Sequence, residues 1–230
     1  MKPMISDAEL MKIQARTLYR LNAEERITGI NEGDFSGAPL LFIGKTQDSI
    51  QTYYHEEMSE SLLNELKESI SDPISINQLL RIIEKYRPIQ NIWMGPAYVY
   101  KGHSTPEMEE DQRIVQITQH NSLLLGTYFA ELQDVIEAKS PVFGYVVEGQ
   151  AVSVCCSART SEAASEASLY TAEPYRGKGY AARVVSRWCE HLHAQGRIAL
   201  YSTSWDNIGS QRIAQKCNLV PYGADFSIYI

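Results

Sequence analysis

The segment 167–182, ASLYTAEPYRGKGYAA, holds the residues whose types and spacing indicate chemistry. Two glycines, Gly177 and Gly179, alternate there with two cations, Arg176 and Lys178. Glycine has no Cβ, so a ligand can approach the backbone closely. The same residues lie where a helix begins, and free N–H groups and the positive end of the helix dipole favour an anion there. We therefore predict a phosphate-binding loop; the alternative is that the two cations are solvated turn charges.

Two elements must position this loop. A short β-prone run, 169–171, precedes it, and a helix is predicted from the loop to about Gln195, where Gly196 suits a left-handed C-terminal cap. The apolar residues of that helix keep the spacing of one buried face: Ala181, Val184, Val185, Trp188 and Leu192. The loop matches neither GxxxxGK[ST] nor a GxGxxG that follows a strand, which excludes the nucleotide P-loop and the Rossmann fingerprint.

The run Arg176–Ala181 resembles the acyl-CoA loop of the GNAT N-acetyltransferases, [Q/R]-x-x-G-x-[G/A]. The L-x-V strand end of that family corresponds to Leu169–Thr171, with Thr in place of Val. A later strand, an Asn at a helix start and a short helix follow in the family's order. The resemblance covers about 115–230. It implies an α+β fold with a mixed, mostly antiparallel sheet flanked by helices, to which we add a largely helical N-terminal part.

The resemblance implies acetyl-CoA as cosubstrate and acetyl donor. In the family, the loop binds the cofactor's phosphates, and the strand before it hydrogen-bonds the pantetheine arm through its backbone. The cofactor-binding residues implied are Leu169, Tyr170, Thr171, Arg176, Gly177, Lys178, Gly179, Tyr180, Ala181, Asn207 and Ser210. Two simpler interpretations stay open, because Tyr170 also suits a strand interior and Asn207 also suits a helix N-cap.

Acetyl transfer to an amine needs a group that removes the proton of the ammonium. Glu166 is the candidate, since it begins the strand that leads to the loop, near the place where some family members have a carboxylate. The alternative is an exposed Glu at a strand end. A carboxylate elsewhere, such as Glu162 or one from the acidic N-terminal half, is the next candidate.

Ala214 marks a departure from the family. Many relatives have a Tyr at this position that protonates the leaving thiolate. Another hydroxyl could replace it, from Tyr201, Ser202 or Tyr222, or the thiolate could leave without a proton donor. The general acid is therefore open.

Composition restricts the remaining possibilities. The chain has 230 residues, 44% hydrophobic, with no apolar run near the roughly 20 residues of a membrane span. Four cysteines, Cys155, Cys156, Cys189 and Cys217, have neither disulfide-framework nor CxxC spacing, so we expect reduced thiols and a cytoplasmic protein. His191 and His193 lie two apart on a helix and do not face each other, so no metal is expected.

Charge is divided unevenly along the chain. Residues 151–230 hold 8 Lys/Arg and 6 Asp/Glu, a balance of +2, and subtraction from the totals of 21 and 28 leaves 13 against 22, or −9, for residues 1–150. This acidity argues against nucleic acid as a partner. It mildly favours a cationic acceptor such as an amine, although the simpler explanation is that acidic helices only promote solubility.

Two parts are predicted, divided by the polar stretch 101–111. Residues 1–110 form a mainly helical N-terminal part that could bind the acceptor, and residues 111–230 form the acetyl-CoA-binding catalytic domain. In the first part, helices are expected from a capping box at Ser6, over Leu62–Ile70 and after Ser75. In the second, strands are expected near 113–118, 142–147 and 152–157, and helices over 122–138 and 177–195 on opposite sheet faces.

Two functions from different classes follow. The first is an N-acetyltransferase that moves acetyl from acetyl-CoA to a small-molecule amine. The run 200–207 and the N-terminal part resemble an antibiotic-modifying branch of the family, which implies an amino-sugar or similar acceptor. The second is a non-catalytic acyl-CoA-binding sensor or regulatory module, indicated by Ala214. Neither nucleic acid nor a membrane is an expected partner, and a homodimer stays open.

Overall fold

The computed structural model describes residues 5–32, 37–102 and 111–230 and divides the chain into two compact units. One unit comprises residues 1–96 with 222–230, and the other comprises 97–221. The predicted boundary at 101–111 falls mostly on 103–110, which lie outside the described residues. The division into 1–110 and 111–230 therefore stays a prediction.

The first unit combines helices with antiparallel strands. Its helices are α1 (Asp7–Leu18), α2 (Glu60–Ser69) and α3 (Ile76–Glu84). Its strands are β1 (Tyr19–Leu21), β2 (Ile27–Ile30), β3 (Leu41–Lys45), β4 (Ile50–Tyr54), the first part of β5 (Asn91–Val99) and most of β11 (Val220–Tyr229). β1 pairs with β2, and the larger sheet has the order β4-β3-β11-β5.

Local sequence signals explain these helices. The Ser6 hydroxyl accepts a hydrogen bond from the Glu9 N–H, as the capping box predicts. The helix ends at Leu18, and Tyr19–Leu21 form β1, although Leu21 continues the one-face spacing of Leu10, Ile13, Thr17 and Leu18. The pairing with β2 stabilises the extended conformation of these three residues, which periodicity along the chain cannot reveal.

The second unit contains the predicted phosphate loop. Its strands are the end of β5, β6 (Ile114–Ile117), β7 (Val142–Val147), β8 (Gln150–Thr160), β9 (Ala164–Thr171) and β10 (Ile198–Ser202). Its helices are α4 (Tyr180–Ala194) and α5 (Ile208–Lys216), with short 3₁₀ segments η1 (Gln119–Leu125), η2 (Ala130–Val135) and η3 (Glu173–Tyr175). The strand order is β5-β10-β9-β8-β7-β6, antiparallel except for β9 and β10.

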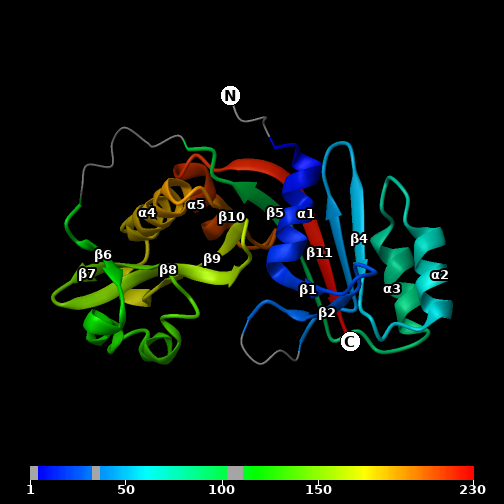
Figure 1. The fold of residues 1–230 in the computed structure, drawn as a ribbon, viewed down its shortest axis with the longest axis horizontal. Helices are drawn as coiled ribbons and strands as arrows, with labels where there is room; N and C mark the ends of the chain where they lie inside the picture. The colour runs from blue at the N-terminus through cyan, green and yellow to red at the C-terminus, as the bar shows by residue number, and fades with distance from the viewer. Residues whose placement is uncertain (1–4, 33–36, 103–110) are drawn as a thin grey trace. The chain divides into compact units, whose positions relative to one another are not determined.

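Two hydrophobic clusters lie on opposite faces of the strands of the second unit. Neighbouring residues of one strand contribute to different clusters, because their side chains point to opposite faces. Phe143 and Cys155 pack with α4, whose Trp188 is fully buried. Val142 and Cys156 pack instead with residues of the η1–η2 segment. Figure 1 shows α4 on one side of β7 and β8 and the short helical turns on the other. The predicted placement of the segments 122–138 and 177–195 on opposite faces of the strands is confirmed.

The predicted continuous helix over 122–138 is wrong. Two 3₁₀ segments, η1 and η2, stand in its place, and Phe129 between them has non-helical φ and ψ of −142° and 39°. Gly126, directly after the first segment, still has helical φ and ψ of −55° and −33°, so the departure from the helical conformation lies at Phe129 rather than at this glycine. The buried residues are Leu125, Phe129 and Ile136. Of these only Ile136 belongs to the apolar face on which the helix prediction rested, which was Leu124, Tyr128, Leu132, Val135 and Ile136.

No helix among the described residues is both long and apolar enough to cross a membrane.

Candidate functional site

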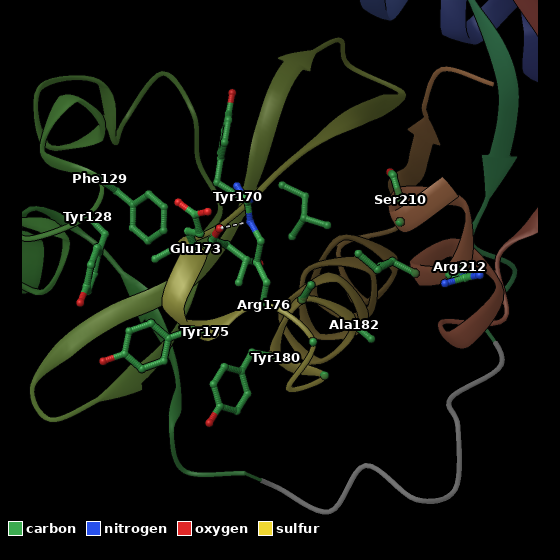
Figure 2. Close-up of a pocket in the computed structure, with 18 of the residues that line it drawn as sticks. Tyr128, Phe129, Tyr170, Glu173, Tyr175, Arg176, Tyr180, Ala182, Ser210 and Arg212 are labelled. Carbon is green, nitrogen blue, oxygen red and sulfur yellow. Dashed lines mark hydrogen bonds between the residues drawn. The ribbon is translucent and has the colours of Figure 1, made fainter. Parts of the chain in front are cut away.

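A cavity of about 930 Å³ lies in the second unit, between the end of β9, the start of α4, one face of α5 and the η1–η2 segment. It is lined by ten of the eleven residues predicted to bind the cofactor: Leu169, Tyr170, Thr171, Arg176, Gly177, Gly179, Tyr180, Ala181, Asn207 and Ser210. Leu169 and Ser210, which are 41 positions apart in the sequence, therefore line the same cavity. Figure 2 shows Ser210 and Arg212 on α5 at one side of it and Tyr128 and Phe129 at the other.

The glycines of the loop have the conformation that the prediction requires. Gly177 and Gly179 have φ of +77° and +81°, in the region that residues with a Cβ rarely occupy. A Cβ built on either glycine would meet no atom within 4 Å, so the space above the loop is open. Gly179 is the N-cap of α4, and the first N–H groups of this helix have no partner within it.

The side chains of the loop are held by neighbours. The Arg176 Nε donates to the Thr171 carbonyl at 3.3 Å, which ties the loop to the end of β9. Tyr180 stacks on Tyr145, with ring centroids 4.0 Å apart and planes at 15°, and this fixes the first turn of α4. Lys178 is not among the lining residues; its Nζ lies 4.8 Å from the centroid of the Tyr175 ring.

The strands β9 and β10 part beside the cavity. Their parallel pairing runs from Ala164 opposite Ile198 to Glu166 opposite Leu200. Beyond this point β10 continues to Ser202 in its pairing with β5, and β9 continues to Thr171 in its pairing with β8. In the described pairings, the β10-facing edge of β9 after Glu166 is thus left with unused backbone N–H and C=O groups, which an extended ligand can bond.

Glu166 lies at the point where the strands part. Its Oε1 accepts hydrogen bonds from the Ser202 backbone N–H at 2.6 Å and from the Ser202 Oγ at 2.8 Å. Its Oε2 is buried and has no hydrogen-bond partner among the described residues. With 4% of its surface exposed, Glu166 is not the exposed strand-end residue of the alternative interpretation.

Burial sets the acidity of Glu166. Removal from water disfavours the charged carboxylate and raises the pKa of Glu166 from its ordinary value of 4.5 to about 7. The two hydrogen bonds from Ser202 and the charge of Arg159 lower this pKa, but burial has the larger effect. A pKa near neutrality suits a group that exchanges protons at physiological pH. Glu166 itself is not among the residues that line the cavity.

The position that corresponds to the Tyr of many relatives offers no proton donor, because Ala214 has only a methyl side chain and is fully buried. Of the three hydroxyls considered in its place, Ser202 donates to Glu166 and Tyr222 donates to Gln14 at 2.7 Å. The Tyr201 Oη lies 2.5 Å from the Oγ of Ser210, a lining residue, but burial raises the pKa of Tyr201 and makes it a weak acid.

Asn207 is the N-cap of α5, since its Oδ1 accepts from the Ser210 N–H at 3.0 Å. It also lines the cavity, so both interpretations of this residue are compatible with the structure. All four cysteines are free and buried, as predicted. Among the residues the structure covers, no cluster of three or more His, Cys, Asp or Glu side chains could hold a metal ion.

Several residues that line the cavity were not predicted from the sequence. The lining residues not predicted include Tyr128, Phe129, Glu131, Leu132, Glu173, Tyr175, Arg212 and Lys216. Those on η1–η2 were hidden by the wrong helix prediction. Arg212 and Lys216 had a usable signal, because they lie four apart on the helix that Asn207 caps and therefore share one face.

Comparisons with known proteins concern the fold and the family. The structure is similar to a GCN5-related N-acetyltransferase from Kribbella flavida, with 12% identity, a TM-score of 0.52 and coverage of 98% of this chain and 96% of that one. It is also similar to an acetyltransferase of the GNAT family from Colwellia psychrerythraea, with 14% identity, a TM-score of 0.50 and coverage of 91% and 84%.

A third structure, a putative GNAT-family acetyltransferase from Novosphingobium aromaticivorans, has 15% identity and a TM-score of 0.48, and covers 61% of this chain and 66% of that one. No curated protein matches the sequence. Residues 92–219, more than half of the chain, match the GNAT acetyltransferase family, whose members are acetyltransferases that generally use acetyl-CoA. The chain therefore belongs to the GNAT acetyltransferase family.

Proposed function

We propose that this protein is an N-acetyltransferase that moves an acetyl group from acetyl-CoA to an amine of a small molecule. The observation that carries the proposal is the parting of β9 from β10 beside a loop with open backbone space. A free strand edge and an anion-binding helix start on one cavity suit a ligand that joins an extended amide-containing arm to phosphates.

The residues present fit acetyl-CoA in this cavity. The loop 176–179 and the first turn of α4 would hold the diphosphate, and the β9 edge at 169–171 would bond the pantetheine arm. Asn207 and Ser210 would contact the arm from α5. When bound, acetyl-CoA supplies an acetyl group on a thioester, which an amine nitrogen can attack while the C–S bond breaks.

Within this proposal Glu166 is the general base. An amine is mostly ammonium at neutral pH and must lose a proton before it attacks. The Oε2 of Glu166 is the accepting atom, because Oε1 is held by Ser202. Since Glu166 does not line the cavity, the proton reaches it through a water molecule.

Burial of Ala214 and the raised pKa of Tyr201 leave the thiolate without a strong acid. This also supports the second candidate, a non-catalytic acyl-CoA sensor. In either role we place the protein in the cytoplasm, in keeping with four free cysteines.

Turnover of acetyl-CoA with a panel of amines tests the function. The panel contains amino sugars, polyamines and simple alkylamines, and release of free CoA thiol is measured against a reaction without acceptor. Acceptor-dependent thiol release with an acetylated amine in the product supports the transferase. Tight CoA binding with no acceptor-dependent release across the panel would favour the sensor.

A further inference from the structure

Two cations on α5 form a second positively charged wall of the cavity. Arg212 and Lys216 both line it and both are exposed. They are four residues apart on one helix, so their side chains extend from the same face. The phosphate loop lies on a different wall, at the start of α4. The cavity therefore presents positive charge from two separate elements.

Neither cation is neutralised by a carboxylate within the described residues. On α4, by comparison, Arg183 pairs with Asp111 at 2.5 Å and Arg187 lies 3.7 Å from Glu190. For Arg212 and Lys216 no ion pair is found with any described acidic residue. An unpaired pair of cations at a cavity wall is available to a ligand anion.

Two carboxylates restrict where that anion can lie. Glu131 and Glu173 also line the cavity, from η2 and η3. A phosphate on their side would meet like charge, whereas a phosphate against α5 meets two cations. A second anionic group of a ligand would therefore be favoured beside α5.

We propose that Arg212 and Lys216 bind a phosphate monoester of the ligand, separate from the diphosphate held by the loop. This inference rests on the proposed function, because CoA has such a group, the 3′-phosphate on its ribose. A monoester carries close to two negative charges at pH 7, which matches two cations. The pair makes the protein discriminate CoA from dephospho-CoA, which is otherwise identical.

The experiment measures the affinities of CoA and dephospho-CoA by calorimetry for three proteins. They are the wild type, the variant Arg212→Gln/Lys216→Gln, and the control Arg81→Gln/Arg87→Gln, which loses the same charge from exposed residues of the first unit. We expect the wild type and the control to bind CoA about tenfold more tightly than dephospho-CoA, a size typical of two exposed ion pairs. In the α5 variant this preference should disappear while the affinity for dephospho-CoA stays constant.

Two results would overturn the proposal. The wild type could bind both ligands equally, or the α5 variant could keep the preference. If the variant kept the preference while it weakened both ligands by the same factor, the pair would be assigned to the diphosphate. If the wild type bound neither ligand, the proposed function itself would fail, and the two failures are thereby distinguished. The swap Arg212→Lys/Lys216→Arg, which keeps both charges, should retain most of the preference.

Discussion

At the scale of single residues, Glu166 combines two tasks in one carboxyl group. Its Oε1 satisfies the Ser202 N–H, which β9 no longer pairs once the strands part. Its Oε2 remains without a partner in the described structure. An unsatisfied buried oxygen costs free energy of about 1–3 kcal/mol, which a functional role would explain.

The variant Glu166→Gln separates these tasks, because its amide oxygen still accepts from Ser202 but no proton can be taken up. With an established acceptor, kcat should fall about 10²–10⁴-fold while CoA affinity is unchanged. The wild-type kcat should rise with pH through an apparent pKa of about 7, since only the ionised carboxylate is a base. Equal kcat in both proteins across pH 6–9 would exclude Glu166 as the base.

The free energy of unfolding, measured as a function of pH, provides the control for this titration, because the measurement requires no substrate. Between pH 4.5 and about 7 the folded carboxyl retains a proton that the unfolded chain has lost, so wild-type stability falls as pH rises through this window. The full difference corresponds to about 3 kcal/mol. Urea unfolding should show this slope in the wild type and not in Glu166→Gln. Parallel pH profiles for the two proteins would show that Glu166 does not titrate near 7.

At the scale of elements, the loop and α4 depend on one residue, Gly179, which ends the loop with a positive φ and caps the helix. A side chain at Gly179 would strain the backbone and would also occupy space that is open to a ligand. Asn tolerates the left-handed region far better than other residues with a Cβ, and its short neutral side chain leaves most of the space free. Gly179→Asn is therefore the matched control for Gly179→Glu.

We expect Gly179→Glu to abolish CoA binding, because a carboxylate would lie where the diphosphate is proposed. Its positive φ should also lower stability by about 1–2 kcal/mol. Gly179→Asn should keep measurable binding with a smaller loss of stability. Calorimetry and thermal unfolding of the three proteins make the comparison. Equal CoA affinity in Gly179→Glu and the wild type would remove the loop from the site.

The elements also show how far the sequence could predict this site. The glycine turn and α4 depend on local signals, two glycines and a helical apolar face, and both elements were located correctly, whereas phosphate binding by the loop stays a prediction. Glu166 and Ser202 lie 36 residues apart, and nothing in their local sequences indicates that one holds the other. Likewise, tertiary packing of Leu125 and Phe129 replaced the predicted helix over 122–138 by two shorter turns. The apolar periodicity of a single sequence carries no information about long-range contacts of this kind.

At the scale of the whole molecule, the candidate site belongs entirely to one compact unit. Every residue that lines the cavity falls within 97–221. A ligand that binds only the folded form stabilises it by mass action, about 2.7 kcal/mol at a concentration of 100 times Kd. If CoA binds in this cavity, it stabilises the unit 97–221, and a fluorescent probe within that unit can detect the stabilisation.

Trp188 is such a probe, because it is fully buried on α4, the helix that begins at the phosphate loop. The other two tryptophans, Trp93 and Trp205, can be replaced by Phe so that fluorescence reports Trp188 alone. With CoA at 100 times Kd, the midpoint of thermal unfolding followed by Trp188 should rise by about 5–11 °C, given roughly 2–4 °C per kcal/mol at this size. The same measurement on Gly179→Glu should show no rise. If calorimetry detects CoA binding to the Trp93→Phe/Trp205→Phe protein but the Trp188 midpoint does not move, CoA binds outside this unit and the cavity is not its site.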